Sequence, residues 1–193
     1  MHGAILAAAE TFEESVSVTE WDRRQGKLAY GCLDPASGVL NHAVILSHLG
    51  EALGVFAEHY VPFSVLCIQI DQLEQIQMRD GPGATASVLR VVGQSLENSL
   101  RPTDFLGRWQ DNQFFAILTE CGIAELPLVG GRLRRMAATS KVEWWGDSLK
   151  VSVSLGGTVV RTGDAVESLT LRAEAALRAS LTQGGACITV ESE

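Results

Sequence analysis

An apolar run at residues 63–70 limits most strongly how this chain can fold. Its sequence, FSVLCIQI, is rich in residues that favour β-strands, and it lies between Pro62 and Asp71. A short run without polar alternation is typical of a strand buried inside a sheet. The segments at 41–60 and 84–100, before and after it, place apolar residues at helical spacing. We therefore expect a sheet that holds this strand in its interior and is covered by helices.

The order of the remaining segments completes the plan. The helix at 41–60 begins at Asn41, whose side chain can cap its first turn. After the buried strand, the sequence predicts in order a short helix at 72–79, a break at 80–83, a long helix at 84–100, strands at 104–109 and 113–119, a helix from about 125, a strand at 149–161, a helix at 165–181 and a strand at 186–190. Strand, helix, hairpin, helix and strand form a split βαβ-type arrangement. The fold class is α/β in the broad sense, or α+β by stricter counting, with a mixed, largely antiparallel central sheet flanked by helices.

Several residues carry more local expectations. Asp71 and Asp164 each precede a predicted helix, where a carboxylate can cap the free backbone N–H groups. The pair Gly156-Gly157 lies inside a predicted strand and indicates a β-bulge.

Composition excludes some classes of partner. The chain has 46% hydrophobic residues, enough for one sizeable core, and a net charge of -8 with a pI near 5.0. This charge argues against a general nucleic-acid surface and against binding to an anionic membrane. An anionic ligand must therefore meet a local arginine cluster, and the basic residues are 12 Arg and 3 Lys. The alternative is that this skew reflects only genomic base composition.

Neither the cysteines nor the apolar segments indicate a secreted or membrane protein. Cys32, Cys67, Cys121 and Cys187 are far apart without CxxC spacing, which argues against a zinc site and a disulfide framework. The apolar segment near the N-terminus is too short to span a membrane and lacks the pattern of a signal peptide. We expect a cytoplasmic protein without direct membrane insertion. Residues 1–33 lack a sustained period and are expected to form an N-terminal appendage or linker, followed by the domain at 34–193.

Several motifs together resemble those of GGDEF domains, the diguanylate cyclase fold. They are DPASGVLN at 34–41, the hairpin around Gln110-Asp111-Asn112-Gln113-Phe114, VSVSLGG at 151–157 and LRAEAALRAS at 171–180. The resemblance covers about residues 34–191. It implies a domain that condenses two GTP molecules to cyclic di-GMP with a divalent metal, one GTP per domain, in a dimer.

The resemblance also implies which residues would bind metal, and these positions are substituted. The family's metal-binding aspartate at the end of the first strand aligns with Gln69, and the third residue of the GGDEF motif aligns with Asn112. Hard carboxylate oxygens are what Mg²⁺ requires, and a neutral amide does not replace their charge. Asp71 and Asp111 could together form a substitute metal site. The alternative interpretation is structural: Asp71 caps a helix and Asp111 favours the turn.

The positions that would hold GTP are substituted as well. The guanine-binding asparagine and aspartate align with Gln77 and Ala86, and the phosphate-binding lysine of the late helix aligns with Ser180. The two glycines of the family motif align with Gln110 and Asp111, whose side chains fill the space that phosphates would need. We therefore expect no cyclase activity, no catalytic residue, no metal site and no cofactor.

One element of the family is retained. Many members carry an inhibitory product site, R-x-x-D, five residues before the motif, and Arg101-Pro102-Thr103-Asp104 matches this register. An arginine can donate to N7 and O6 of guanine while a carboxylate accepts from its N1 and N2. The resemblance supplies a second arginine from the next helix, Arg132, and Gly130-Gly131 before it would allow a ligand to approach closely.

We expect a catalytically inactive domain that binds cyclic di-GMP through Arg101, Asp104 and Arg132 and controls assembly or a partner. The expected protein partner is a second copy of the chain, in a homodimer, or a partner signalling protein. The simpler reading is that Arg101 pairs with Asp104 and that the arginines of the helix are only solvated. An alternative function is a nucleotide-independent dimerisation or docking module that uses the N-terminal arm and the pair Trp144-Trp145. Residual cyclase activity is the third possibility.

Overall fold

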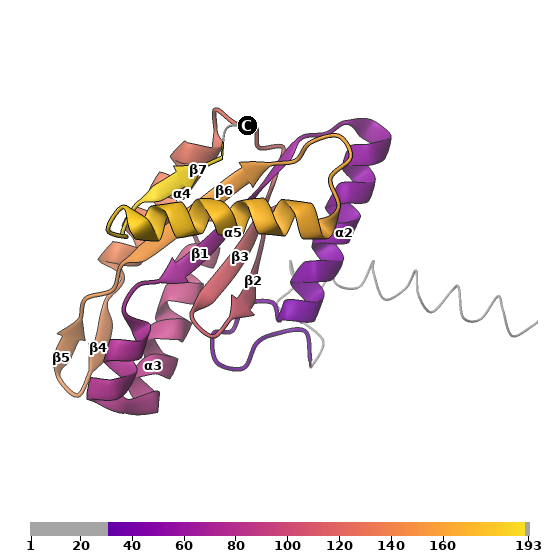
Figure 1. Ribbon diagram of the computed structural model, residues 1–193. Coiled ribbons are helices and arrows are strands. Elements are labelled where there is room, and N and C mark those ends of the chain that lie inside the picture. Colours follow the sequence, from indigo (N-terminus) through magenta and orange to yellow (C-terminus); the bar gives the residue numbers. More distant parts are fainter. Residues whose placement is uncertain (1–30, 192–193) are drawn as a thin grey trace, which may run out of the picture. The chain divides into compact units, whose positions relative to one another are not determined.

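The computed structural model describes residues 31–191, which contain a sheet with helices on both faces (Figure 1). The helices are α2 (His42–His59), α3 (Leu73–Glu97), α4 (Leu126–Thr139) and α5 (Val166–Thr182). The strands are β1 (Phe63–Ile70), β2 (Phe105–Gln110), β3 (Gln113–Thr119), β4 (Val142–Trp144), β5 (Asp147–Leu149), β6 (Val153–Val159) and β7 (Ile188–Val190). The appendage predicted for residues 1–33 lies, except for its last three residues, outside the described residues.

The apolar run at 63–70 is the central strand, as its sequence predicted. The main sheet has the order β2-β3-β1-β6-β7, so β1 has a neighbour on each side. It pairs antiparallel with β3 and with β6, while β6 and β7 are parallel. The mixed, largely antiparallel sheet expected from the element order is confirmed.

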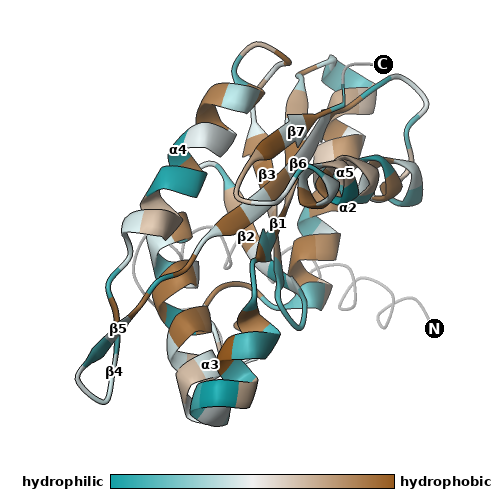
Figure 2. Cartoon of the chain, turned by 60° about the vertical axis from the view of Figure 1, so that its left-hand side comes forward, coloured by the Kyte–Doolittle hydropathy of each residue, from teal (hydrophilic) through white to brown (hydrophobic). Residues whose placement is uncertain are grey.

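Side chains of β1 alternate between two apolar cores. Leu66 and Ile68 face the core shared with α3 and α4, and Val65 and Cys67 face the core shared with α2 and α5. Figure 2 shows α3 and α4 on one side of the sheet and α2 and α5 on the other. A strand buried on both faces explains why FSVLCIQI carries almost no polar residue.

The predicted break between two helices is a kink within α3. Gly81 has φ 83° and ψ 179°, outside the helical region, and Pro82 follows it. Glycine adopts this backbone without a steric penalty. The two halves of α3 therefore run in different directions, and the kink lies beside the small sheet of β4 and β5.

Three local expectations were wrong. Asp71 does not cap α3, which begins after Gln72, and Asp164 does not cap α5, which begins after Ala165. β6 keeps an unbroken register with β1, so the Gly156-Gly157 pair forms no bulge there. A Cβ at Gly156 would lie 1.9 Å from the backbone nitrogen of Leu177, so this glycine is needed for α5 to approach the sheet.

The β4–β5 hairpin was not predicted as a separate element. It forms its own two-stranded sheet, and its turn contains Trp145 with φ 50° and Gly146 with φ 90°. The sequence placed a single long strand at 149–161, whereas β6 covers only Val153–Val159. Among the described residues, no helix combines the length and apolar character needed to cross a bilayer.

Candidate functional site

The hairpin of β2 and β3 carries the turn on which the sequence comparison with GGDEF domains depends. Gln110 pairs with Gln113 across the turn, which leaves Asp111 and Asn112 at its tip. The pairing is irregular between Arg108 and Gln110. The hairpin and its turn are therefore confirmed at the predicted residues.

Two glutamines occupy the point where β1 and β3 approach this turn. Gln69 and Gln113 are direct neighbours in the antiparallel register, and Gln113 Nε2 donates to Gln69 Oε1 at 3.0 Å. Gln113 is the fourth motif position, for which the resemblance predicted no role. The sequence could have indicated its place near the site, because Gln113 directly follows Asn112 in the same motif.

This donor set does not fit a divalent cation such as Mg²⁺. The Gln69 carboxamide oxygen is already engaged by the Gln113 amide, and neither side chain carries a charge. Within residues 31–191, no group of three or more His, Cys, Asp or Glu side chains is placed to hold a metal ion.

Asp71 is held by two serines at the start of β6, Ser152 just before the strand and Ser154 within it. Its carboxylate accepts from Ser152 Oγ and from Ser154 Oγ, both at 2.6 Å. Its backbone N–H donates to the carbonyl of Ser152 at 2.9 Å. These contacts make Asp71 a link between the end of β1 and the start of β6.

Replacing Asp71 by alanine should lower the free energy of unfolding by about 1–3 kcal/mol, because two hydroxyl groups lose a charged acceptor. Asp111→Ala is the matched control: this exposed turn residue should change stability by less than about 0.5 kcal/mol. Urea unfolding with and without Mg²⁺ separates the two roles. Stabilisation of the wild type by Mg²⁺ that disappears in either variant would instead identify a metal ligand.

Arg108 lies immediately before the turn and is partly buried. Its Nη2 donates to the carbonyl of Asp111, its guanidinium carbon lies 5.4 Å from the centre of the Phe114 ring, and its Nη1 is a buried donor without a partner in the described chain. Burial lowers the pKa of Arg108, while the charges of Asp34 and Asp111 act in the opposite direction. The guanidinium is thus fixed beneath the turn.

The remaining residues at predicted GTP-binding positions lie on different helices and do not form one site. Gln77 and Ala86 are exposed on the two halves of α3, on either side of the kink. Ser180 is fully buried, and its Oγ donates to the carbonyl of Leu155 at 2.6 Å. A hydroxyl committed to the sheet in this way stabilises the contact of α5 with β6 and is not presented to a ligand.

The corner between α3 and β2 holds Arg101 and Asp104 together through the backbone. Asp104 is 6% exposed, and its carboxylate accepts from the N–H of Arg101 at 3.0 Å and from the N–H of Thr119 at 3.1 Å. The Arg101 residue is exposed. The corner is therefore a turn in which Asp104 bonds two backbone N–H groups, and Arg101 lies on the surface.

The same turn occurs a second time in the chain. Arg161 donates its backbone N–H to Asp164 Oδ2 at 2.8 Å, and Asp164 donates back to the carbonyl of Arg161 at 3.1 Å. The corner at Arg101 has the same pair of bonds, at 3.0 Å each. The turn itself is hence a structural motif, and any ligand preference must come from its surroundings.

Those surroundings include α4. Arg101 and Asp104 line a small hollow of about 20 Å³ together with Glu120, Glu125 and Val129. This volume is close to that of one water molecule, so a larger ligand would rest on the surface around the hollow. Arg132 does not line it, but it follows Val129 by three residues in α4, which places it on the same side of the helix one turn further on.

Gly130 does not have the role expected for it. A Cβ there would lie 2.0 Å from Cδ1 of Ile188 in β7, so the glycine allows α4 to approach the sheet. Gly131 has only the end of the Arg135 side chain within 4 Å of a Cβ. Any close approach of a ligand beside Arg132 is therefore limited to Gly131.

Comparisons with known proteins agree on one family. The family described as "Diguanylate cyclase, GGDEF domain" matches residues 32–187. The diguanylate cyclase DgcP of Pseudomonas aeruginosa is 26% identical over 156 residues, which are 81% of this chain and 23% of that protein. The chain thus spans about a quarter of the length of the curated relatives it matches.

Solved structures share the fold at lower identity. The diguanylate cyclase SiaD of Pseudomonas aeruginosa, solved with its activator SiaC, superposes with a TM-score of 0.83 at 22% identity over 96% of this chain and 72% of that one. The GGDEF domain of DgcB from Caulobacter crescentus, solved in complex with c-di-GMP, gives 0.80 at 19% identity over 84% of this chain and 97% of that one.

Proposed function

Because the chain belongs to the family of diguanylate cyclase GGDEF domains, we propose that it is a catalytically inactive member that binds cyclic di-GMP. The ligand would contact Arg101 and Arg132, and Asp104 would fix the corner between α3 and β2 that carries Arg101. Binding would control the assembly of this chain or its contact with a partner signalling protein.

The loss of catalysis is supported by the amide pair at the ends of β1 and β3. The family resemblance requires carboxylates at Gln69 and Asn112, and the Gln69 amide is hydrogen-bonded to Gln113, which follows Asn112 in the chain. Ser180, where the resemblance requires a phosphate-binding lysine, is buried and bonded to the sheet. Several independent groups needed for phosphoryl transfer would have to be restored together.

Retained binding is supported mainly by the corner. An exposed arginine stands at its predicted register, on a turn fixed by Asp104 and next to the helix that carries Arg132. Two guanidinium groups on neighbouring elements suit a ligand with two phosphates and two guanines, because each can bond a phosphate or the N7 and O6 edge. Glu120 and Glu125 beside the hollow oppose the negative phosphates, so we expect the guanine edge to face them.

Isothermal titration with cyclic di-GMP, in EDTA and again with Mg²⁺, tests this function. We expect saturable binding at about 10 μM or tighter, with the same affinity under both conditions because no metal is needed. Incubation with GTP and Mg²⁺ or Mn²⁺ should give no cyclic di-GMP. Absence of heat would refute the receptor function, and formation of product would refute inactivity.

An alternative is a nucleotide-independent interaction module of the same fold. It is favoured by one observation, the 90% exposure of Trp145 in the β4–β5 turn. A stable dimer or complex that forms equally with and without nucleotides, in a chain that gives no heat with cyclic di-GMP, would support it.

A further inference from the structure

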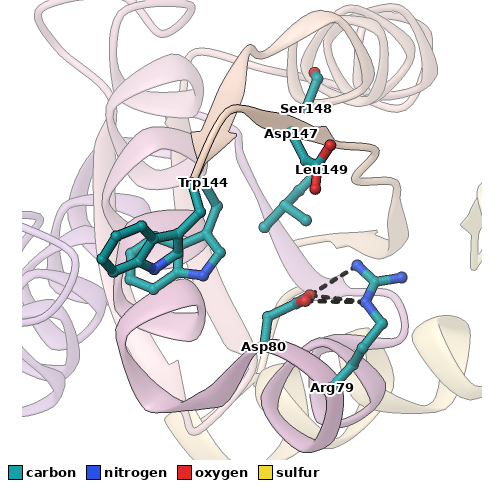
Figure 3. Close-up of a pocket in the computed structure, with 7 residues that line it drawn as sticks. Arg79, Asp80, Trp144, Asp147, Ser148 and Leu149 are labelled. Carbon is teal, nitrogen blue, oxygen red and sulfur yellow. Dashed lines mark hydrogen bonds and ion pairs between the residues drawn. The ribbon is translucent and has the colours of Figure 1, made fainter.

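A second hollow lies between α3 and the β4–β5 hairpin (Figure 3). It measures about 700 Å³, within the range of ligand-binding pockets. It is lined by Arg79, Asp80, Trp144, Trp145, Asp147, Ser148 and Leu149. None of these residues belongs to the proposed nucleotide site.

Trp144 fixes the hairpin against the kink of α3. A Cβ on Gly83 would lie 2.5 Å from Cη2 of the Trp144 ring, so the indole rests directly on the helix backbone there. The two tryptophan rings meet edge to face, with centroids 6.3 Å apart at 88°. The wall of the hollow is therefore anchored, and Trp145 extends from it.

Trp145 contributes little to the fold at its position. It is 90% exposed and has φ 50°, in a turn whose residue types are usually Asn or Gly. A bulky residue in the left-handed region costs about 1 kcal/mol or more. An unburied indole held at this cost is typical of a residue that is used in binding, and tryptophan is enriched among binding hot spots.

The charges around the hollow favour a cationic occupant. Arg79 Nη2 bonds Asp80 Oδ2 at 2.7 Å, which neutralises most of both charges. Asp147 is the first residue of β5, across the hollow from Arg79. Figure 3 shows its carboxylate turned toward the hollow and toward Arg79. The three charged groups sum to a net negative charge beside an exposed aromatic ring, and that combination attracts cations and repels phosphates.

We propose that this hollow binds a basic side chain, an arginine or lysine, from an exposed segment of a partner protein. The cation would stack on Trp145 and pair with Asp147. The hollow adjoins a second one of about 380 Å³ that shares Arg79, Ser148 and Leu149, so there is room for the residues flanking the basic side chain. Within the described chain β5 pairs only with β4, which leaves its outer edge for the backbone of such a segment.

A blocked tetra-arginine peptide is the probe, and the indole N–H signal of Trp145 in ¹H–¹⁵N spectra is the readout. The signal is assigned by its absence in Trp145→Phe. We expect a saturable shift that tetra-glutamate and a neutral peptide do not cause. Asp147→Asn should weaken binding about threefold or more, since the pair is at the surface.

Glu143→Gln is the matched control, because Glu143 is an exposed carboxylate of the same hairpin that does not line the hollow. It should leave the affinity unchanged. Equal weakening in Asp147→Asn and Glu143→Gln would show only general attraction to an acidic protein and would overturn the proposal. So would the lack of a shift at millimolar peptide, or a concentration-dependent dimer that Trp145→Ala abolishes, which would make a second copy of this chain the occupant. Cyclic di-GMP binding is measured separately, so either proposal can fail alone.

Discussion

Arg101→Ala should weaken cyclic di-GMP binding about 10- to 100-fold. A hydrogen bond to a charged group contributes about 1.5–3 kcal/mol, and the exposed guanidinium would be the main donor from this corner. The substitution leaves the turn in place, because Asp104 accepts from the backbone N–H of residue 101, which alanine retains. Isothermal titration of wild type and variant measures the loss, and urea unfolding should show nearly equal stability.

The second R-x-x-D turn gives this prediction an internal control. Arg161 is exposed like Arg101, and its turn has the same pair of bonds with Asp164. Arg161→Ala removes the same charge from the same kind of turn, which here connects β6 to α5. We expect unchanged affinity in this control and a loss in Arg132→Ala. Similar losses in Arg101→Ala and Arg161→Ala would mean that overall charge, and not the corner, sets the affinity.

The elements that the sequence predicted are those set by local pattern. β1 is confirmed because an unbroken apolar run has few alternatives, and α2 because Asn41 caps it, accepting from the N–H of Val44 at 3.0 Å. The kink of α3 is confirmed because Gly81 and Pro82 interrupt any helix. In each case the decisive residues lie within one turn of the feature they determine.

The wrong predictions concern features that depend on contacts with a segment distant in the sequence. Asp71 has the sequence signal of a helix cap, but its carboxylate is bound by Ser154 in β6 and by Ser152 just before that strand. Glycines inside a strand predict a bulge and a close approach equally well, and only the position of Leu177 distinguishes them at Gly156. The β4–β5 hairpin was missed because each of its strands has only three residues.

The candidate site shows the same limit. Register alone placed Arg101 and Asp104, but it did not reveal that Asp104 bonds backbone N–H groups or that a second such turn exists. The pairing of Gln69 with Gln113 follows from the register of β1 against β3, which a single sequence does not give. The sequence could therefore predict which residues lie at the candidate site where a motif gives their positions, but it could not predict their hydrogen-bond partners.

Gly156→Ala should be the most damaging small substitution in the domain. Its new Cβ would lie 1.9 Å from the nitrogen and 2.4 Å from the Cα of Leu177, and backbone atoms cannot rotate away as a side chain can. Helix α5 would have to move off β6, which would open the core around Leu169 and Ala173. We expect a loss of about 3 kcal/mol or more, a large share of the stability of an ordinary domain.

Gly54→Ala and Gly157→Ala separate this clash from the general effect of replacing glycine. A Cβ at Gly54, exposed in α2, meets nothing within 4 Å, so the variant should be stabilised by up to about 1 kcal/mol through helix propensity. A Cβ at Gly157 would meet Cδ2 of Leu66 at 2.6 Å, a flexible methyl group that can shift, and the backbone oxygen of Val65 at 3.1 Å, a milder contact than that at Gly156. The loss of stability should therefore be intermediate. Urea midpoints should therefore fall in the order Gly54→Ala, wild type, Gly157→Ala, Gly156→Ala. A Gly156→Ala variant as stable as Gly157→Ala would mean that α5 does not rest on the backbone of β6 in solution.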